Sequence, residues 1–123
     1  MENNSRATAL RIYVSNTDKF RNNLLYEVIV FAARRSGLAG ATVHKGMMGF
    51  GSGSKIHSTK FWELTEKLPV VIEIIDDTAK IEQFIDKIKP WMEKVRYGCL
   101  ITVEEVMVVL FKQGSKKKGL FDF

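Results

Sequence analysis

PVVIEIIDDT, residues 69–78, joins a strand to a helix and decides the fold. Its almost unbroken apolar run over residues 70–75 predicts a strand that is covered on both faces. The polar cluster at residues 76–78 is typical of a helix start. Apolar residues then recur at helical spacing, at Ile81, Phe84, Ile85, Ile88, Met92 and Val95. Pro90 lacks a backbone N–H group, so we expect this helix to end or kink at Lys89.

Strand and helix patterns also occur on both sides of this stretch. Leu10–Val14 alternates apolar and polar residues, which predicts a strand with one buried face. A helical period begins at Leu24 and ends at Gly37, and Asn22 or Asn23 is a candidate N-cap. Residues 41–48 and 100–111 predict two more strands, the last with a bulge or an exposed rim at Glu104-Glu105. Residues 61–67 fit either a helix or a strand.

The resulting order, β-α-β-β-α-β, predicts an α+β fold of the ferredoxin-like type. Two helices would cover one face of a four-stranded antiparallel sheet, in a two-layer sandwich. The other face carries Val, Ile, Tyr and Met side chains and needs a cover, which self-association would supply. A chain of 123 residues suggests a single domain. We place it at residues 9–113, between a flexible tail at 1–8 and a basic tail at 114–123.

Composition and charge exclude several classes of protein. The formal net charge is +5, but most of the excess lies in the C-terminal segment, at Lys112, Lys116, Lys117 and Lys118. Specific nucleic-acid binding is therefore not expected. The longest apolar run, Val106–Phe111, is far shorter than the ~20 residues of a membrane helix. The start of the chain holds no apolar signal core, so we expect a cytoplasmic protein. Cys99 is the single cysteine, which excludes an internal disulfide, and we expect a buried, inert thiol.

Glycines at positions 46, 49, 51 and 53 make residues 46–60 the most flexible stretch of the sequence. Glycines let backbone N–H groups approach phosphates, and Lys55 adds positive charge. The spacing matches neither the Walker pattern nor GxGxxG, so a mobile hairpin loop is the plainer interpretation. His57 on this loop is either an exposed polar residue or a contact to a phosphate or metal.

Glu73 is the one charged residue inside the apolar run at 70–75. A carboxylate there must reach solvent, a cation or a hydrogen-bond donor. Two interpretations stay open: a salt bridge at a strand end or interface, or a ligand contact such as one to a ribose hydroxyl. The histidines, His44 and His57, lack partners at metal-ligand spacing, so no metal site is predicted. No nucleophile adjoins a base, so no catalytic residue is predicted either.

Four segments together resemble the domain-of-unknown-function 190 family: LRIYVSNTDK (10–19), GLAGATVHKGMMGFG (37–51), KIHS (55–58) and LPVVIEIID (68–76). The resemblance spans about Ala9 to Lys112. That family belongs to the PII-like signalling superfamily. The resemblance implies a homotrimer whose sheets face one another inside. It also implies nucleotide clefts between subunits and a loop after the second strand, the T-loop, that contacts target proteins.

The resemblance assigns residues to both regions. The nucleotide cleft would comprise Gly40, Thr42, Gly49, Phe50, Gly51, Glu73, Ile75, Arg96 and Lys112. The T-loop-like segment at 51–60 would contact a partner through Ser52, Gly53, Ser54, Lys55, His57, Ser58 and Lys60. The chain departs from the PII pattern because the phosphate loop shrinks to residues 94–98 and the paired arginines are replaced by Phe111-Lys112. Fewer cations favour AMP or ADP over ATP as the effector.

These observations predict a trimeric regulatory protein that binds an adenine nucleotide, requires no cofactor and is not an enzyme. Its loop would contact a partner such as a membrane transporter or channel, without membrane insertion. A divalent-metal-responsive trimer is an alternative, with His44, His57, Glu73 and Cys99 as possible ligands. A protein-only interaction module and a slow nucleotide hydrolase are the others.

Overall fold

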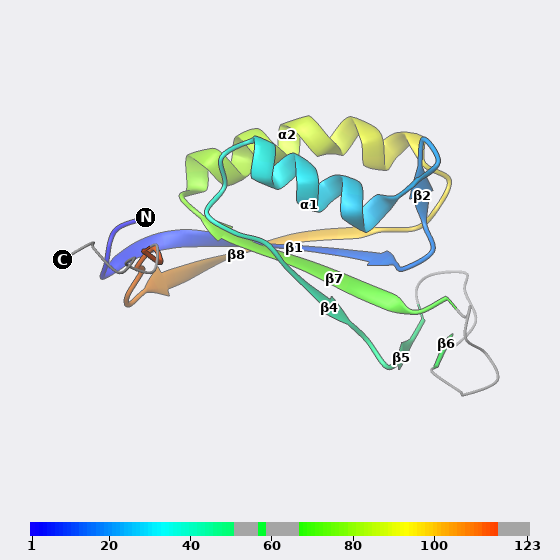
Figure 1. Cartoon of the computed structure of the whole chain (residues 1–123), viewed down its shortest axis with the longest axis horizontal. Helices are drawn as coiled ribbons and strands as arrows, with labels where there is room; N and C mark the ends of the chain where they lie inside the picture. The colour runs from blue at the N-terminus through cyan, green and yellow to red at the C-terminus, as the bar shows by residue number, and fades with distance from the viewer. Residues whose placement is uncertain (51–56, 59–66, 116–123) are drawn as a thin grey trace, which may run out of the picture.

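A computed structural model describes residues 1–50, 57–58 and 67–115. Its main sheet has four antiparallel strands in the order β4-β7-β1-β8, and both helices cover the same face (Figure 1). The strands are β1 (Ser5–Ser15), β4 (Thr42–Lys45), β7 (Pro69–Asp76) and β8 (Leu100–Val108). The helices are α1 (Leu25–Arg35) and α2 (Thr78–Lys94). This is the predicted α+β, ferredoxin-like βαββαβ sandwich.

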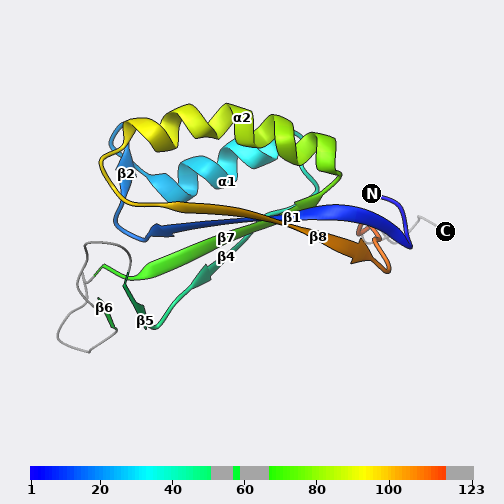
Figure 2. The same ribbon diagram turned by 180° about the vertical axis from the view of Figure 1, so that it is seen from behind.

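Two short ladders flank the main sheet. One pairs β2 (Lys19–Phe20) with β3 (Asn23–Leu24), between β1 and α1. The other pairs β5 (Met48–Gly49) with β6 (His57–Ser58) beyond the end of β4. Both views place this second ladder at the end of the sheet that is far from the N-terminus (Figures 1 and 2).

The core lies between the helices and one face of the sheet. Its fully buried large apolar side chains come from both helices and the two central strands: Leu10, Ile12, Leu25, Ile29, Ile72, Ile74, Ile81, Phe84 and Ile88. Burial alternates along β7, so Val71, Glu73 and Ile75 point to the opposite face and remain partly exposed. The expectation that this strand is covered on both faces is therefore wrong for a single chain, because both helices lie on one side. We call the other side the open face.

Strand β1 begins earlier than the alternating pattern suggested. Residues 5–8, which we expected in a flexible tail, pair with β8, and Ala7 is 1% exposed. The pairing continues without interruption past Glu104 and Glu105, so β8 has no bulge there, but both side chains are exposed, as the alternative of an exposed rim predicted. Both carboxylates instead face arginines of β1: Glu104 contacts Arg11, and Glu105 contacts Arg6. Cross-strand charge pairing explains how two glutamates fit in an otherwise apolar strand.

The helix ends differ from the expectations in two places. The N-cap of α1 is Leu24, with no side-chain cap hydrogen bond, because Asn22 lies in the turn between β2 and β3 and Asn23 belongs to β3. Helix α2 continues through Pro90 to Lys94. Its last turn is held by packing, since Met92 is 5% exposed and Trp91 stacks on Phe20 with ring centroids 5.6 Å apart. Gly37, in contrast, ends α1 as predicted, with a φ of +78° that favours glycine.

The connection into β7 is anchored to the segment that follows β1. The Leu68 N–H donates to Asn16 Oδ1 at 2.7 Å, and the Asn16 N–H donates to the Leu68 carbonyl at 2.9 Å. Asp18 is 1% exposed, and Lys67 Nζ lies 3.4 Å from its Oδ1. These contacts give the polar residues after β1 a structural role. Most of the ambiguous segment 61–67 lies outside the described residues.

Gly46 is needed for a close approach rather than for flexibility. Its N–H donates to the Pro69 carbonyl at 2.8 Å, and a Cβ there would lie 2.7 Å from Pro69 Cγ. Real Cβ atoms do not approach that closely, so a larger residue would push β4 away from the start of β7. In the described part of the chain, no helix is long and apolar enough to cross a membrane.

Candidate functional site

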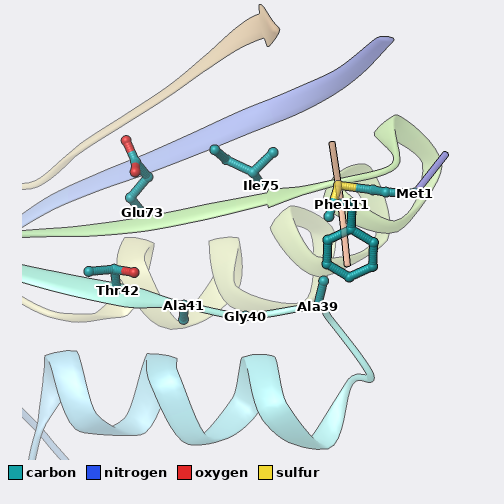
Figure 3. A pocket seen from close by; sticks show the side chains of 8 residues that line it. All are labelled: Met1, Ala39, Gly40, Ala41, Thr42, Glu73, Ile75 and Phe111. Atoms are coloured by element: carbon teal, nitrogen blue, oxygen red, sulfur yellow. The ribbon is translucent and has the colours of Figure 1, made fainter. Parts of the chain in front are cut away.

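A pocket of about 320 Å³ lies beside the C-terminal half of β7 (Figure 3). Its walls come from the α1–β4 connection, from β4 and β7, and from both ends of the described chain: Met1, Ala39, Gly40, Ala41, Thr42, Glu73, Ile75 and Phe111. Gly40, Thr42, Glu73 and Ile75 are four of the residues that the resemblance assigned to a nucleotide cleft. Sequence reasoning did not assign the other four lining residues to the cleft: Met1, Ala39, Ala41 and Phe111.

Asp76 shapes one wall of the pocket. Its side chain is buried at the end of β7, where Oδ2 accepts the Ala39 N–H at 2.8 Å and Oδ1 accepts the Asp77 N–H at 2.7 Å. The first hydrogen bond ties the α1–β4 connection to the sheet. Next to it, a Cβ on Gly40 would meet nothing within 4 Å, so the missing side chain leaves open space. Asp76, which the sequence suggested only as part of a helix start, thus organises the pocket.

Glu73 lies between the pocket and the guanidinium group of Arg11. It is directly opposite Thr42 on β4 and directly opposite Arg11 on β1. The Arg11 Nε lies 3.0 Å from Glu73 Oε2, and its Nη1 lies 3.3 Å from Glu104 Oε1. Both hydrogen bonds raise the pKa of Arg11, and the one to Glu73 has the larger effect. The two interpretations of Glu73 are therefore compatible, because this one side chain both forms a salt bridge and lines the pocket.

The lining combines apolar walls with a few polar groups. In Figure 3, Thr42 and Glu73 lie toward one end of the pocket, and Phe111 and Met1 lie toward the other. Among the residues that the structure describes, no lysine or arginine side chain lines the pocket. Lys112 directly follows Phe111 and is exposed. Such a lining suits a flat ring with hydroxyl groups better than it suits a phosphate, which needs cationic or N–H donors.

At the other end of the sheet lie three further residues that the resemblance assigned to the cleft: Gly49, Phe50 and Arg96. Gly49 belongs to β5, where a Cβ would lie 3.2 Å from Pro69 Cγ, and the exposed Phe50 follows it. Arg96 follows α2 and lies over the Tyr97 ring, 5.6 Å from its centroid. Strand β7 runs from Pro69 to Asp76, and the pocket lies beside its C-terminal half. Within one chain, the length of this strand therefore separates these residues from the pocket.

The T-loop-like segment is described only in part. Ser58 and His57 pair through their backbones with Met48 and Gly49. Gly51, Ser52, Gly53, Ser54, Lys55 and Lys60 lie outside the described residues. Among the residues that are described, no group of three or more His, Cys, Asp or Glu side chains is arranged to hold a metal ion.

Cys99 is exposed, which contradicts the expectation of a buried thiol. It lies before β8, at an edge that the helices do not cover. Two effects nevertheless raise the pKa of the Cys99 thiol. The larger is partial burial of the sulfur, and the smaller is the negative charge of Asp18. The thiol is therefore accessible but remains neutral near pH 7.

This arrangement sets an expectation for alkylation of Cys99. At pH 7, iodoacetamide should react more slowly with Cys99 than with glutathione, because only the thiolate is nucleophilic. The rate should keep rising by about tenfold per pH unit beyond pH 8.5, the usual thiol midpoint. Mass spectrometry of timed samples measures the rate. A plateau below pH 8 would contradict a raised pKa.

Comparisons with known proteins relate the whole folded region to one family. The model of the DUF190 family, described as "Uncharacterized ACR", matches residues 7–108. A UPF0166 protein of Aquifex aeolicus (strain VF5) is 37% identical over 100 residues, which cover 81% of this chain and 90% of that protein. A UPF0166 protein of Methanocaldococcus jannaschii is 36% identical over 104 residues, or 84% of this chain and 92% of that one.

A solved structure shows the same fold at low sequence identity. It is CPII, a nitrogen regulatory PII-like protein from Thiomonas intermedia K12, bound to ADP, AMP and bicarbonate. The TM-score is 0.66 at 15% identity, and the match covers 86% of this chain and 91% of CPII. The βαββαβ chain of the structure therefore has a PII-like fold.

Proposed function

Because the chain belongs to the DUF190 family and has a PII-like fold, we propose that it is a regulatory protein that binds AMP or ADP. The pocket beside β7 is the proposed site. The observation that carries this proposal is the convergence of Gly40, Thr42, Glu73 and Ile75 on one pocket. The similarity to CPII, which is bound to ADP and AMP, supports the same ligand class.

The lining supports a specific orientation of the nucleotide. The adenine ring would pack on Ile75 and Phe111, and the ribose hydroxyls would face Thr42 and Glu73. The phosphates would point out of the pocket, away from the Glu73 carboxylate. With no lysine or arginine among the described lining residues, a short phosphate chain is favoured over a triphosphate.

A trimer would complete the site. The open face carries partly or largely exposed apolar side chains, including Tyr13, Val71 and Leu100, and its cover is missing in a single chain. A chain of this size that leaves an apolar sheet face exposed is expected to associate through it. A neighbouring copy would then bring its own Gly49, Phe50 and Arg96 toward the pocket. This arrangement would account for the distance between these residues and the pocket within one chain.

The segment at 51–60 would carry the signal. Its base is the β5–β6 ladder, which places His57 and Ser58 beside Met48 and Gly49. We propose that nucleotide binding orders or releases this segment and so changes its contact with a partner protein, as in other order–disorder switches. A membrane transporter or channel is the class of partner that we propose.

Calorimetric titration with AMP, ADP, ATP and cyclic AMP, with and without Mg²⁺, tests the nucleotide proposal. We expect a dissociation constant below about 100 μM for AMP or ADP, which corresponds to about −5.5 kcal/mol. The stoichiometry should be one nucleotide per chain, and ATP should bind more weakly. Absence of heat and of competition with all four nucleotides would reject the proposal. Mass photometry or sedimentation on the same sample measures whether the protein is a trimer.

A further inference from the structure

A line of polar side chains crosses the open face of the sheet. Thr42, Glu73, Arg11 and Thr102 are successive cross-strand neighbours on β4, β7, β1 and β8. The neighbouring row on one side, toward the β5–β6 ladder, holds Val71, Tyr13 and Leu100. On the other side lie Ile75 and Ala9. We call Thr42, Glu73, Arg11 and Thr102 the polar row.

Arg11 holds the centre of the polar row in place. Its Nε contacts Glu73 Oε2 at 3.0 Å, while its Nη1 contacts Glu104 Oε1 at 3.3 Å. The planar guanidinium carries donors in a rigid fork, so two carboxylates restrain it more than one does. Arg11 and Glu73 are each 30% exposed, so solvent screens this pair only in part.

The contact also determines which part of Glu73 remains for a ligand. Arg11 engages Oε2, and no hydrogen-bond partner for Oε1 occurs among the described residues. The Glu73 side chain lines the pocket together with Thr42, its cross-strand neighbour. A carboxylate that is held in one orientation beside a hydroxyl can accept a hydrogen bond from a neighbouring sugar hydroxyl. Without Arg11, the partly buried carboxylate would turn toward solvent to keep its charge solvated.

We propose that Arg11 is a positioning residue that holds Glu73 as the acceptor for the ribose hydroxyls, so that the pocket selects a ligand with a vicinal diol. This inference rests on the proposed nucleotide function and adds a source of specificity to it. The selectivity would come from the ribose contact of Glu73, separately from the contacts of the phosphate groups.

Paired ligands distinguish positioning from a general structural role. The probes are AMP and 2′,3′-dideoxyadenosine monophosphate, which lacks both hydroxyls. The unmodified protein should bind AMP about tenfold more tightly than the dideoxy nucleotide, because one charge-assisted hydrogen bond is lost. Arg11→Gln should weaken AMP binding by about tenfold and change dideoxynucleotide binding by less than about twofold.

Arg6→Gln is the matched control. Arg6 also lies on β1 and pairs with a glutamate of β8, but its pair is exposed and does not contact the pocket. The affinity of the Arg6→Gln variant for both nucleotides should match that of the unmodified protein. Arg11→Lys, which keeps the charge but loses the fork, should give an intermediate loss for AMP alone. Melting temperatures of all variants establish that each one is folded.

The outcomes separate the two proposals. Equal losses for AMP and the dideoxy nucleotide in Arg11→Gln, or no loss for either, would overturn the role of Arg11 while leaving nucleotide binding intact. Equal binding of the two nucleotides by the unmodified protein would also overturn it. If the unmodified protein binds neither nucleotide, the proposed function itself fails, and this inference fails with it.

Discussion

Replacing Gly40 with leucine should weaken AMP or ADP binding by about a hundredfold, since overpacking a filled site costs roughly 2–3 kcal/mol. A Cβ at this position meets nothing within 4 Å, and the backbone of Gly40 is outside the left-handed region. The new side chain therefore enters the pocket without straining the fold. The melting temperature should remain within a few degrees of that of the unmodified protein.

Gly114→Leu is the matched control for this substitution. A Cβ on Gly114 also meets nothing within 4 Å, but this residue does not line the pocket. Its affinity should match that of the unmodified protein. Gly40→Ala should give a smaller loss than leucine, in proportion to the volume added. Unchanged affinity in Gly40→Leu would place the ligand somewhere other than this pocket.

Of the substitutions proposed for this protein, removal of the Asp76 side chain should cause the largest loss in the free energy of unfolding. Asp76 is 2% exposed, and Asp76→Ala removes the acceptor of two part-buried hydrogen bonds, from the N–H groups of Ala39 and Asp77. A hydrogen bond to a charged group contributes about 1.5–3 kcal/mol, so we expect a loss of about 2–4 kcal/mol in the free energy of unfolding. Nucleotide affinity should fall as well, because the wall formed by Ala39 is no longer tied to β7.

Urea denaturation at one fixed protein concentration measures this loss, because self-association would otherwise shift the midpoint. Asp76→Asn keeps one acceptor oxygen and should lose about half as much. Asp77→Ala is the neighbouring control: Asp77 makes no side-chain cap hydrogen bond, so its loss should stay below about 1 kcal/mol. Similar midpoints for Asp76→Ala and Asp77→Ala would mean that the Ala39 connection is held by other contacts.

Local patterns were sufficient for most of the fold. The apolar run at 70–75, the helical period beginning at Ile81 and the stop at Gly37 each report a preference within a few neighbouring residues. Such preferences are read directly from the chain. Where packing competes with propensity, the pattern was misleading: Pro90 does not end α2, because Trp91 and Met92 beyond it remain packed.

The candidate site was accessible from sequence only in part. Gly40, Thr42, Glu73 and Ile75 were identified through a resemblance, and the structure brings them to one pocket. Phe111 was noted only as part of the Phe111-Lys112 pair that replaces the paired arginines of the PII pattern, and nothing local indicates that its ring lines the pocket. The separation of Gly49 and Arg96 from the pocket was likewise invisible, because it depends on the direction of β7.

The sequence by itself determined the order of the elements and the apolar faces that they bury, because periodicity and turn residues act over short range. Only the tertiary structure decided the partners of individual side chains. Arg11, Glu73 and Glu104 are far apart in the chain, and the register between β1, β7 and β8 makes them neighbours. A shift of one residue in that register would turn each side chain to the other face of the sheet. The polar row and the pocket beside it therefore exist because long-range strand pairing selected one register.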